Sequence, residues 1–478
     1  MKARILAPEN RKWWTLAAVA FGLFMIMLDN TVVNVALPSI ERDLHMTVSQ
    51  LEWIVTAYAL TFAALMLTGG KLADLLGRRL IFMVGLGVFT AASLACGLAP
   101  SAGFLIGARI VQGAGAALMN PATLSIITAT FPPRQRGTAI GIWAGTSALA
   151  LAIGPLVGGL LTEHVNWNWI FYVNVPVGLA GLVVARFAID ESRDTSHVQR
   201  LDLPGLASSA FGLFALTYGL TEGNAYGWGS ARILASLAIA VASLVAFVLL
   251  ELRQRLPMLD LSLFRNRSFA GANAIAMMVT LAMFGVFFFV SLFVQQVLGY
   301  SPVQAGAIFL PMTVLIVLVA PIAGRLSDRI GSRGLLGGGM ALVGVSLILF
   351  SRMQVGWSFW NLLPAMVVGG LGMAITMTPM TAVAMSSVPV DKAGVGSGVL
   401  NSFRQVGGSL GIALMGAILA VYTTAPASSP EHVTEFVQGL HHALLVSAGI
   451  AFTAALVGVT TVRKARHADE PVAMLEAA

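Results

Sequence analysis

Long uninterrupted runs of apolar residues dominate this chain and limit what it can fold into. Most runs are near 20 residues, the length at which an α-helix spans the hydrocarbon core of a bilayer. Only 10% of the 478 residues are charged, whereas soluble proteins carry roughly 25%. That is too little charge for a water-facing surface, so the sequence predicts an all-α protein that crosses a membrane many times.

Fourteen spans are expected from these runs. They lie near 13–36, 50–69, 80–99, 102–127, 138–161, 169–189, 204–222, 231–251, 270–297, 303–323, 335–351, 359–384, 398–421 and 441–462. The first run follows a basic stretch, as a signal sequence does. It continues to Ala36 without a convincing small-residue cleavage site, so we expect a retained first span.

The distribution of basic residues gives the expected topology. With the N-terminus in the cytoplasm, 23 of the 28 Lys and Arg residues fall in inside segments. Only Arg42 and Arg352 fall outside, and Arg109, Arg232 and Arg404 lie in or at the edge of spans. This bias predicts an even number of spans in the cell (inner) membrane, with both termini cytoplasmic. Twelve spans would require two neighbouring segments to be misread together.

An internal repeat divides the chain. GKLADLLGRR, Gly70 to Arg79, recurs as GRLSDRIGSR, Gly324 to Arg333, at an offset of 254. Two six-helix halves separated by an inserted pair of spans would give this spacing. We expect bundles at 1–189 and 269–478, with a linker and two inserted helices at 190–268. Repeated halves are typical of secondary transporters, whose site lies between the halves near the bilayer midplane.

Other classes of protein find little support. The single cysteine, Cys96, excludes an intramolecular disulfide and a cysteine metal site. There is no Walker-type phosphate loop and no nucleophile motif, so we expect no enzyme activity, no cofactor and no metal. The net charge of +7 comes from short loops, which indicates orientation in lipid rather than nucleic-acid binding. A channel or a sensor remains an alternative, but the repeat favours alternating access.

Two charged residues lie within apolar spans. Asp29, in MLDNTVVNVALP, comes about 16 residues after Trp13, roughly 24 Å along a helix. A carboxylate at that depth can alternate between protonated and ionised forms as water access changes; the alternative is an Asp at the outer interface. Arg109, in LIGARIVQGAGAA, needs a cavity or a partner, unless it extends to the membrane interface.

Two further motifs combine Gly with Pro or with charge. In GTSALALAIGPLVGG, Pro155 should kink a helix, while Gly154, Gly158 and Gly159 allow close helix approach or form a generic packing face. In GGKLADLLGRR, Gly70 should let helices approach closely. Asp74 can place negative charge near a neighbouring helix N-terminus, and Arg78 and Arg79 add inside charge or ion pairs.

These motifs together resemble the major facilitator superfamily, and more narrowly its fourteen-span drug:proton antiporters of the QacA/EmrB type. The resemblance covers nearly the whole chain. It implies that the first loop is a conformational latch and that Arg109 takes part in proton transfer. It also implies that the Pro155 motif distinguishes exporters from importers. The latch residues would be Gly70, Asp74, Gly77, Arg78 and Arg79, with Asp328, Arg329 and Arg333 in the second copy. Asn168 stands where the family usually has an arginine.

The function expected is proton-coupled export of hydrophobic or amphipathic compounds, with a proton-coupled carrier of one metabolite as the alternative. Asp29 would carry or relay the proton, and Arg109 would help to set its protonation. Glu222 is expected to be solvated, because its span lies outside the family's transporting core. The expected partners are small molecules, protons and lipid, and a monomer is the expected state. Candidate cavity residues are Asn34, Tyr58, Gln295 and Asn401.

Overall fold

The computed structural model describes residues 8–193, 202–254, 257, 259, 261–388, 393–425 and 429–462. Within these residues the regular elements are all helices. The first group comprises α2 (Pro8–Leu44), α3 (Val48–Leu76), α4 (Arg78–Gly97), α5 (Ala102–Thr130), α6 (Pro133–His164), α7 (Trp169–Tyr172) and α8 (Asn174–Ala188). The two helices that follow are α9 (Leu203–Tyr226) and α10 (Ala231–Arg253).

The second group begins with the 3₁₀ helix η1 and contains the π-helical turn η2. Its members are η1 (Leu261–Arg265), α11 (Arg267–Leu292), η2 (Phe293–Val297), α12 (Pro302–Ile308), α13 (Leu310–Ile330), α14 (Ser332–Phe350), α15 (Phe359–Ser386), α16 (Ala393–Tyr422) and α17 (Pro430–Thr461).

The described residues contain 13 segments long and apolar enough to cross a membrane. The 32-residue helix α6 is not among them, but it packs along α2 within the first group. With α6 included, the number of long helical segments equals the number of spans expected from the sequence. The expected seventh and eighth spans correspond to α9 and α10.

Two spans contain breaks that the hydropathy pattern does not reveal. The sixth divides at Val173 into α7 and α8, and the tenth divides at Phe309 into α12 and α13. Pro311 stands in the first turn of α13. Because proline has no N–H and its ring clashes with the carbonyl of the residue four positions earlier, a helix readily breaks in the turn before it. The first span is longer than expected, since α2 runs for 37 residues.

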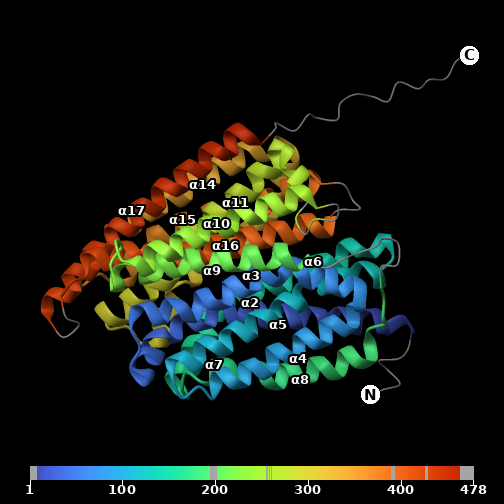
Figure 1. The fold of residues 1–478 in the computed structure, drawn as a ribbon, viewed down its shortest axis with the longest axis horizontal. Helices are drawn as coiled ribbons and strands as arrows, with labels where there is room; N and C mark the ends of the chain where they lie inside the picture. The colour runs from blue at the N-terminus through green and yellow to red at the C-terminus, as the bar shows by residue number, and fades with distance from the viewer. Residues whose placement is uncertain are drawn as a thin grey trace, which may run out of the picture.

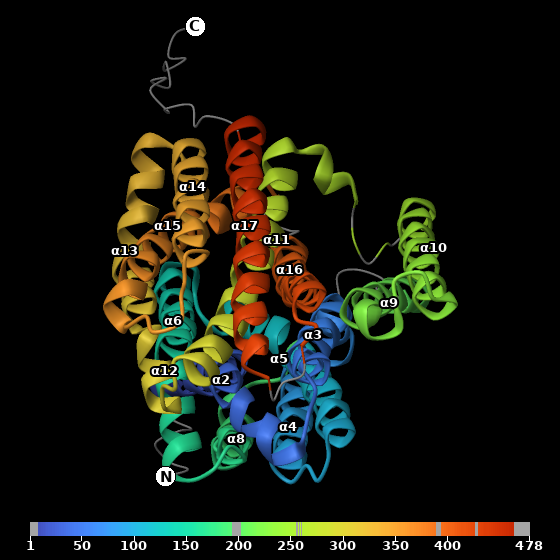
Figure 2. The ribbon, with the colours of Figure 1, turned by 90° about the vertical axis from the view of Figure 1, so that its left-hand side faces the viewer.

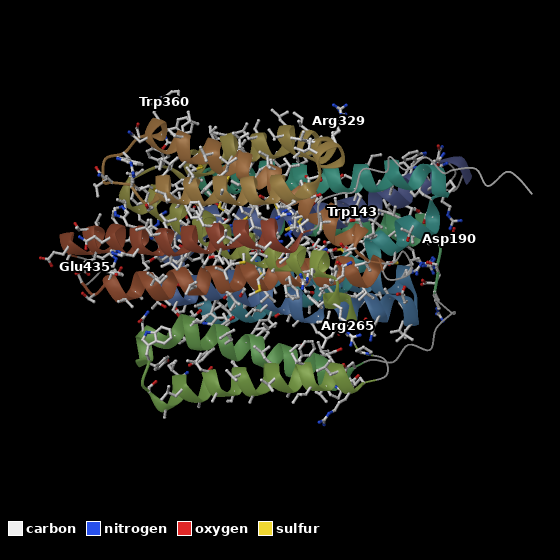
Figure 3. All side chains as sticks on the ribbon, turned by 90° about the horizontal axis from the view of Figure 1, so that it is seen from above. Trp143, Asp190, Arg265, Arg329, Trp360 and Glu435 are labelled. Carbon is white, nitrogen blue, oxygen red and sulfur yellow. The ribbon has the colours of Figure 1, made fainter. Side chains whose placement is uncertain are left out.

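The two groups form two bundles that lie side by side. Figure 1 shows the first bundle in blue and teal beneath the second in yellow to red, with most helix axes nearly parallel. Figure 3 labels residues at both ends of these helices, with Glu435 at one end and Asp190 at the other. These ends are called the Glu435 end and the Asp190 end below.

Helices α9 and α10 pack on each other at the edge of the molecule, beside α3 and α16 (Figure 2). Asn224 of α9 donates a hydrogen bond of 2.7 Å to the carbonyl of Ala417 on α16. Near the other end, Lys71 of α3 donates to the carbonyl of Pro257, 3.1 Å away. Helix α9 therefore contacts one helix from each bundle, and the segment after α10 also bonds to α3.

Asp202 caps the start of α9 and links it to the end of α10. Its carboxylate accepts hydrogen bonds of 2.8 Å from the amide of Gly205 and from the side chain of Gln254. Burial raises the pKa of Asp202, but these hydrogen bonds outweigh it and hold the pKa below its ordinary value. This ionised cap fixes the two inserted helices against each other.

The repeat seen in the sequence is also a repeat of backbone geometry. Gly77 separates α3 from α4 at φ +123°, and Gly331 separates α13 from α14 at φ +86°. Both values lie in the region that only glycine adopts readily. The two glycines are 254 positions apart, so the same sharp helix-to-helix turn stands at equivalent places in the two bundles.

Candidate functional site

An ion pair between Asp29 of α2 and Arg109 of α5 lies inside the first bundle. Arg109 Nη1 contacts Asp29 Oδ2, and the two side chains are 1% and 0% exposed. Fifteen residues separate Asp29 from the end of α2 at Leu44, about 22 Å of helix. The structure therefore places Asp29 deep in the bundle, where a carboxylate needs a partner, and supplies that partner from another helix.

Gln112 completes the surroundings of this pair. Its amide nitrogen donates to Asp29 Oδ1 at 2.9 Å and to the hydroxyl of Ser93 on α4 at 2.8 Å. Its amide oxygen accepts from Arg109 Nη1 at 2.6 Å, and the Cys96 thiol lies 3.6 Å from it. Gln112 follows Arg109 by three residues, so both side chains share one face of α5.

The guanidinium of Arg109 is enclosed on its remaining sides. Its Nε donates to the carbonyl of Ile54 on α3 at 3.0 Å. Its central carbon lies 4.1 Å from the ring centroid of Tyr58 and 5.9 Å from that of Phe171, distances at which aromatic rings stabilise a cation. Five helices, α2, α3, α4, α5 and α7, thus contribute to a buried site whose donors match an ionised Asp29.

The four candidate cavity residues lie in different places. Tyr58 is 0% exposed and packs on Arg109, so it belongs to the ion-pair site. Asn34 and Gln295 lie where α2 meets the second bundle, and Gln295 donates to the carbonyl of Val35 at 3.0 Å. Asn401 of α16 bonds within its own helix. Its neighbour Ser402 lines an apolar cavity of about 190 Å³ beside the inserted helices.

The loop from Gly70 to Arg79 differs in detail from the expectation. The Asp74 carboxylate pairs with Arg78 one turn later, with both nitrogen–oxygen distances 3.0 Å. The start of α4 is instead capped by Glu191, which accepts from the backbone amides of Arg79 and Leu80 at 3.1 Å. The turn at Gly77 directs these amides toward Glu191, so Asp74 is not the residue that serves this helix N-terminus.

The close helix contact in this motif falls at Gly69 rather than Gly70. A Cβ on Gly70 would be 3.5 Å from Pro121, an ordinary contact, whereas one on Gly69 would overlap with the carbonyl oxygen of Ala117. In the second copy, Arg329 (Figure 3) and Arg333 are exposed. The side chain of Asp328 lies outside the described part of the chain.

The motif around Pro155 forms contacts on two sides of α6. A Cβ on Gly154 would overlap with the Thr31 hydroxyl, and one on Gly158 would be 2.6 Å from the carbonyl oxygen of Val32. Both glycines therefore face α2. A Cβ on Gly159 would overlap with the carbonyl oxygen of Pro302 on α12, so this glycine lies at the contact between the two bundles.

Further contacts join the bundles in their halves toward the Glu435 end. The amide of Val303 donates to Glu163 at 2.9 Å, and Ser291 donates to the carbonyl of Asn34 at 3.0 Å. A Cβ on Gly306 of α12 would overlap with the carbonyl oxygen of Pro155. The structure is therefore a conformation in which α6 and α12 are closed on each other toward this end.

Comparison with known proteins decides the family. A model described as the Major Facilitator Superfamily matches residues 19–412. The chain belongs to the major facilitator superfamily. It is 38% identical over 412 residues to the tetracenomycin C resistance and export protein of Streptomyces glaucescens, covering 86% of this chain and 77% of that protein. It is 37% identical over 477 residues to a puromycin resistance protein of Streptomyces alboniger, covering 97% and 94%.

Solved structures confirm the major facilitator fold. A bacterial homolog of the human lysosomal transporter Spinster, in an inward-facing and unoccupied conformation, matches with a TM-score of 0.68. The match covers 95% of this chain and 97% of that chain at 18% identity. A peptide transporter crystallised with sulfate matches with a TM-score of 0.66 at 15% identity. The match of the family model confirms the resemblance to the superfamily inferred from the motifs.

Several residues of the site were not identified from the sequence. Gln112 and Ser93 are polar residues within apolar spans. The one sequence feature that points to either of them is that Gln112 follows Arg109 by three residues, which places both on one face of a helix. Glu191 stood in a stretch that resembled a linker. Glu222, expected to be solvated, instead accepts hydrogen bonds from Ser49 at 2.7 Å and from the Trp53 indole at 3.2 Å. The expectation for Glu222 was wrong because it ignored the packing of α9 on α3.

Replacing Glu191 with Ala should destabilise the fold by about 1 kcal/mol, because the first amides of α4 lose their acceptor. The change in stability is measured by thermal unfolding in detergent, with size-exclusion chromatography used to monitor the protein that remains folded. Asp190→Ala is the matched control, because Asp190 is 74% exposed in its pair with Arg11 and such pairs contribute little. Equal destabilisation by the two substitutions would contradict the capping role of Glu191.

Proposed function

We propose that this protein exports hydrophobic or amphipathic drug-like compounds in exchange for protons. Relatives that it matches over most of its length are named for resistance to tetracenomycin C and puromycin, and a multidrug resistance protein of Mycobacterium tuberculosis is 38% identical. These shared names favour a cytotoxic natural product or drug as cargo. They support an exporter over an importer of a nutrient.

The observation that carries proton coupling is the pairing of Asp29 with donors on both carboxylate oxygens. Arg109 Nη1 faces Oδ2 and the Gln112 amide faces Oδ1. This arrangement suits the ionised form, because a protonated carboxyl would turn its own hydrogen toward a donor. Protonation of Asp29 would therefore weaken its pairing with Arg109 and free the helices α2 and α5 to move relative to each other. Proton binding at Asp29 would then directly permit the conformational change.

The bundles would alternate access by rocking about the site between them. We assign the units as residues 1–189, the inserted region 190–268 and 269–478. Contacts through Gly159 and Gly306 would close the Glu435 end. The Gly70–Arg79 loop, with Asp74 paired to Arg78, would act as the latch at the Asp190 end. The second-copy residues Asp328, Arg329 and Arg333 would have the corresponding role in the second bundle.

By the positive-inside rule, the distribution of basic residues favours a cytoplasmic position for the Asp190 end. The Glu435 end would then face outward, in the cell membrane, with both termini inside. The pair α9 and α10, together with α6, favours the fourteen-span drug:proton antiporters of the QacA/EmrB type within the superfamily. A monomer contains both bundles and is therefore sufficient for this mechanism.

Proteoliposomes that contain the purified protein test the proposal. With an acidic interior, vesicles in which the cytoplasmic side faces out should accumulate a fluorescent cationic dye or puromycin. The accumulation should collapse on addition of a protonophore. A wide panel of such compounds that shows no movement under an imposed pH difference would refute the exporter function. Movement in the opposite direction would identify a proton-coupled importer.

A further inference from the structure

A second buried carboxyl lies away from Asp29, toward the Glu435 end of α3. Glu52 is 3% exposed, and its Oε2 has no hydrogen-bond partner among the described residues. Its Oε1 lies against Gly416 of α16, where a Cβ would overlap with it. The carboxyl is therefore held at the contact between a helix of the first bundle and a helix of the second.

The inserted helix α9 contributes another carboxyl to the same junction. Glu222 interacts electrostatically with Glu52, and its Oε1 accepts hydrogen bonds from Ser49 at 2.7 Å and from Trp53 at 3.2 Å. Ser49 and Trp53 flank Glu52 on α3. The hydroxyl of Thr221 on α9 also faces Glu52. Glu222 thus has two donors on one oxygen, whereas the Thr221 hydroxyl is the one donor that faces Glu52 among the described residues, and Glu52 Oε2 has no partner there.

The charges around Glu52 do not favour its ionised form. From α9, the titratable group that faces it is Glu222; from α16, the neighbour is Gly416, which has no side chain. No cation is among the groups of the described residues that interact with Glu52. A buried carboxylate that has no counter-ion, leaves one oxygen without a partner and lies beside a second carboxylate is disfavoured, even with one hydroxyl facing it. The proton is therefore the ligand that fits this position.

We propose that Glu52 is a second proton-binding site, at the junction of α3, α9 and α16, which must take up a proton before the Glu435 end can close. The proton comes from water on that side and binds Oε2, while Glu222 keeps its hydrogen bonds and its charge. When α16 moves away from α3, water reaches Glu52 and the proton returns to the same side. This inference rests on the proposed alternating access, and it gives the inserted helix α9 a role in it.

Closure of the Glu435 end on protonation of Glu52 is the direction that a proton-driven exporter requires. Acid outside the cell would protonate Glu52 after the cargo has left, and closure of the Glu435 end would follow. At higher pH the ionised carboxyl would oppose burial between α3 and α16, so the open form would be favoured. Glu52 would therefore make closure depend on the outer pH, separately from the ion pair at Asp29.

Infrared difference spectroscopy of the purified protein tests the proton directly. Wild-type protein near neutral pH should show the carbonyl stretch of a protonated buried carboxyl, and Glu52→Gln should lose that band. Glu431→Gln is the matched control, since Glu431 is exposed at the same end of the molecule and should leave the band intact. A band that persists unchanged in Glu52→Gln would overturn the assignment. The measurement needs no cargo, so it is independent of whether transport itself is observed.

Disulfide trapping tests the link to closure. Glu163→Cys and Val303→Cys, in a Cys96→Ser background, place thiols where α6 meets α12. Cross-linking should increase as pH falls, and Glu52→Gln, which resembles the protonated acid, should cross-link well even at high pH. Glu431→Gln should keep the wild-type pH dependence. Unchanged pH dependence in Glu52→Gln, or cross-linking that follows the sodium concentration at fixed pH, would overturn the proposal.

Gly416→Ala gives an independent variant should Glu52→Gln fail to accumulate. The added Cβ would occupy the place of Glu52 Oε1 and force the carboxyl toward water. The infrared band should then be lost even though Glu52 is still present. Retention of the band in Gly416→Ala would show that the protonated group is not at this junction.

Discussion

Asp29→Asn is expected to reduce proton-driven efflux to the level of a de-energised control. The substitution removes the group that exchanges a proton and leaves Arg109 buried without a counter-ion. Removal of one partner from a buried ion pair typically costs about 3–5 kcal/mol. The variant should therefore also unfold at a lower temperature. Efflux of a fluorescent substrate from energised cells and thermal unfolding of the purified protein measure the two effects.

The double variant Asp29→Asn/Arg109→Gln distinguishes the loss of proton-coupled transport from the loss of thermal stability. It removes both charges, so no buried ion is left unpaired, and most of the lost thermal stability should return. Transport coupled to protons should not return, because no titratable group remains at the site. If the double variant pumped drug against a gradient like the wild type, the ion pair would be structural and Asp29 would have no part in coupling.

Much of the fold could be predicted from the sequence because the membrane limits the choice of structure. An apolar run of about 20 residues is expected to be a helix in lipid, and the positions of Lys and Arg predict which loops lie inside. The repeat at Gly70 and Gly324 revealed the two bundles. The break at Val173 could not be predicted, because it leaves hydropathy unchanged and depends on how the half-helices pack. The break at Phe309 leaves hydropathy unchanged too, and only Pro311 indicates it in the sequence.

The candidate site was predictable to the extent that a charge stood inside a span. Asp29 and Arg109 were conspicuous for that reason, although the sequence did not show that they contact each other. Glu52 and Glu222 lie near the ends of expected spans, where solvated acids are common. Only the packing of α9 and α16 against α3 shows that Glu52 is buried and that Glu222 bonds to side chains of α3. Partners such as Gln112 and Glu191 likewise depend on tertiary contacts between distant segments.

Gly159→Val should shift the protein away from the conformation in which the Glu435 end is closed. The new side chain would meet the backbone of Pro302 on α12, and a backbone carbonyl has little room to move. Overpacking costs about 1–3 kcal/mol, which changes the ratio of two conformations by about 5- to 150-fold. Labelling of Asn34→Cys by a membrane-impermeant maleimide added from the outer side should accelerate, and efflux should fall at least several-fold.

Gly145→Val is the matched control because it lies on the same helix, and a Cβ there would meet nothing within 4 Å. Both substitutions introduce the same β-branched residue into α6, so a general loss of helix stability would affect them alike. Labelling and efflux in Gly145→Val should remain close to wild type. Gly306→Val, on the opposite side of the contact, should reproduce the effect of Gly159→Val, because its Cβ would meet Pro155. Equal behaviour of Gly145→Val and Gly159→Val would contradict a gating role for the contact between α6 and α12.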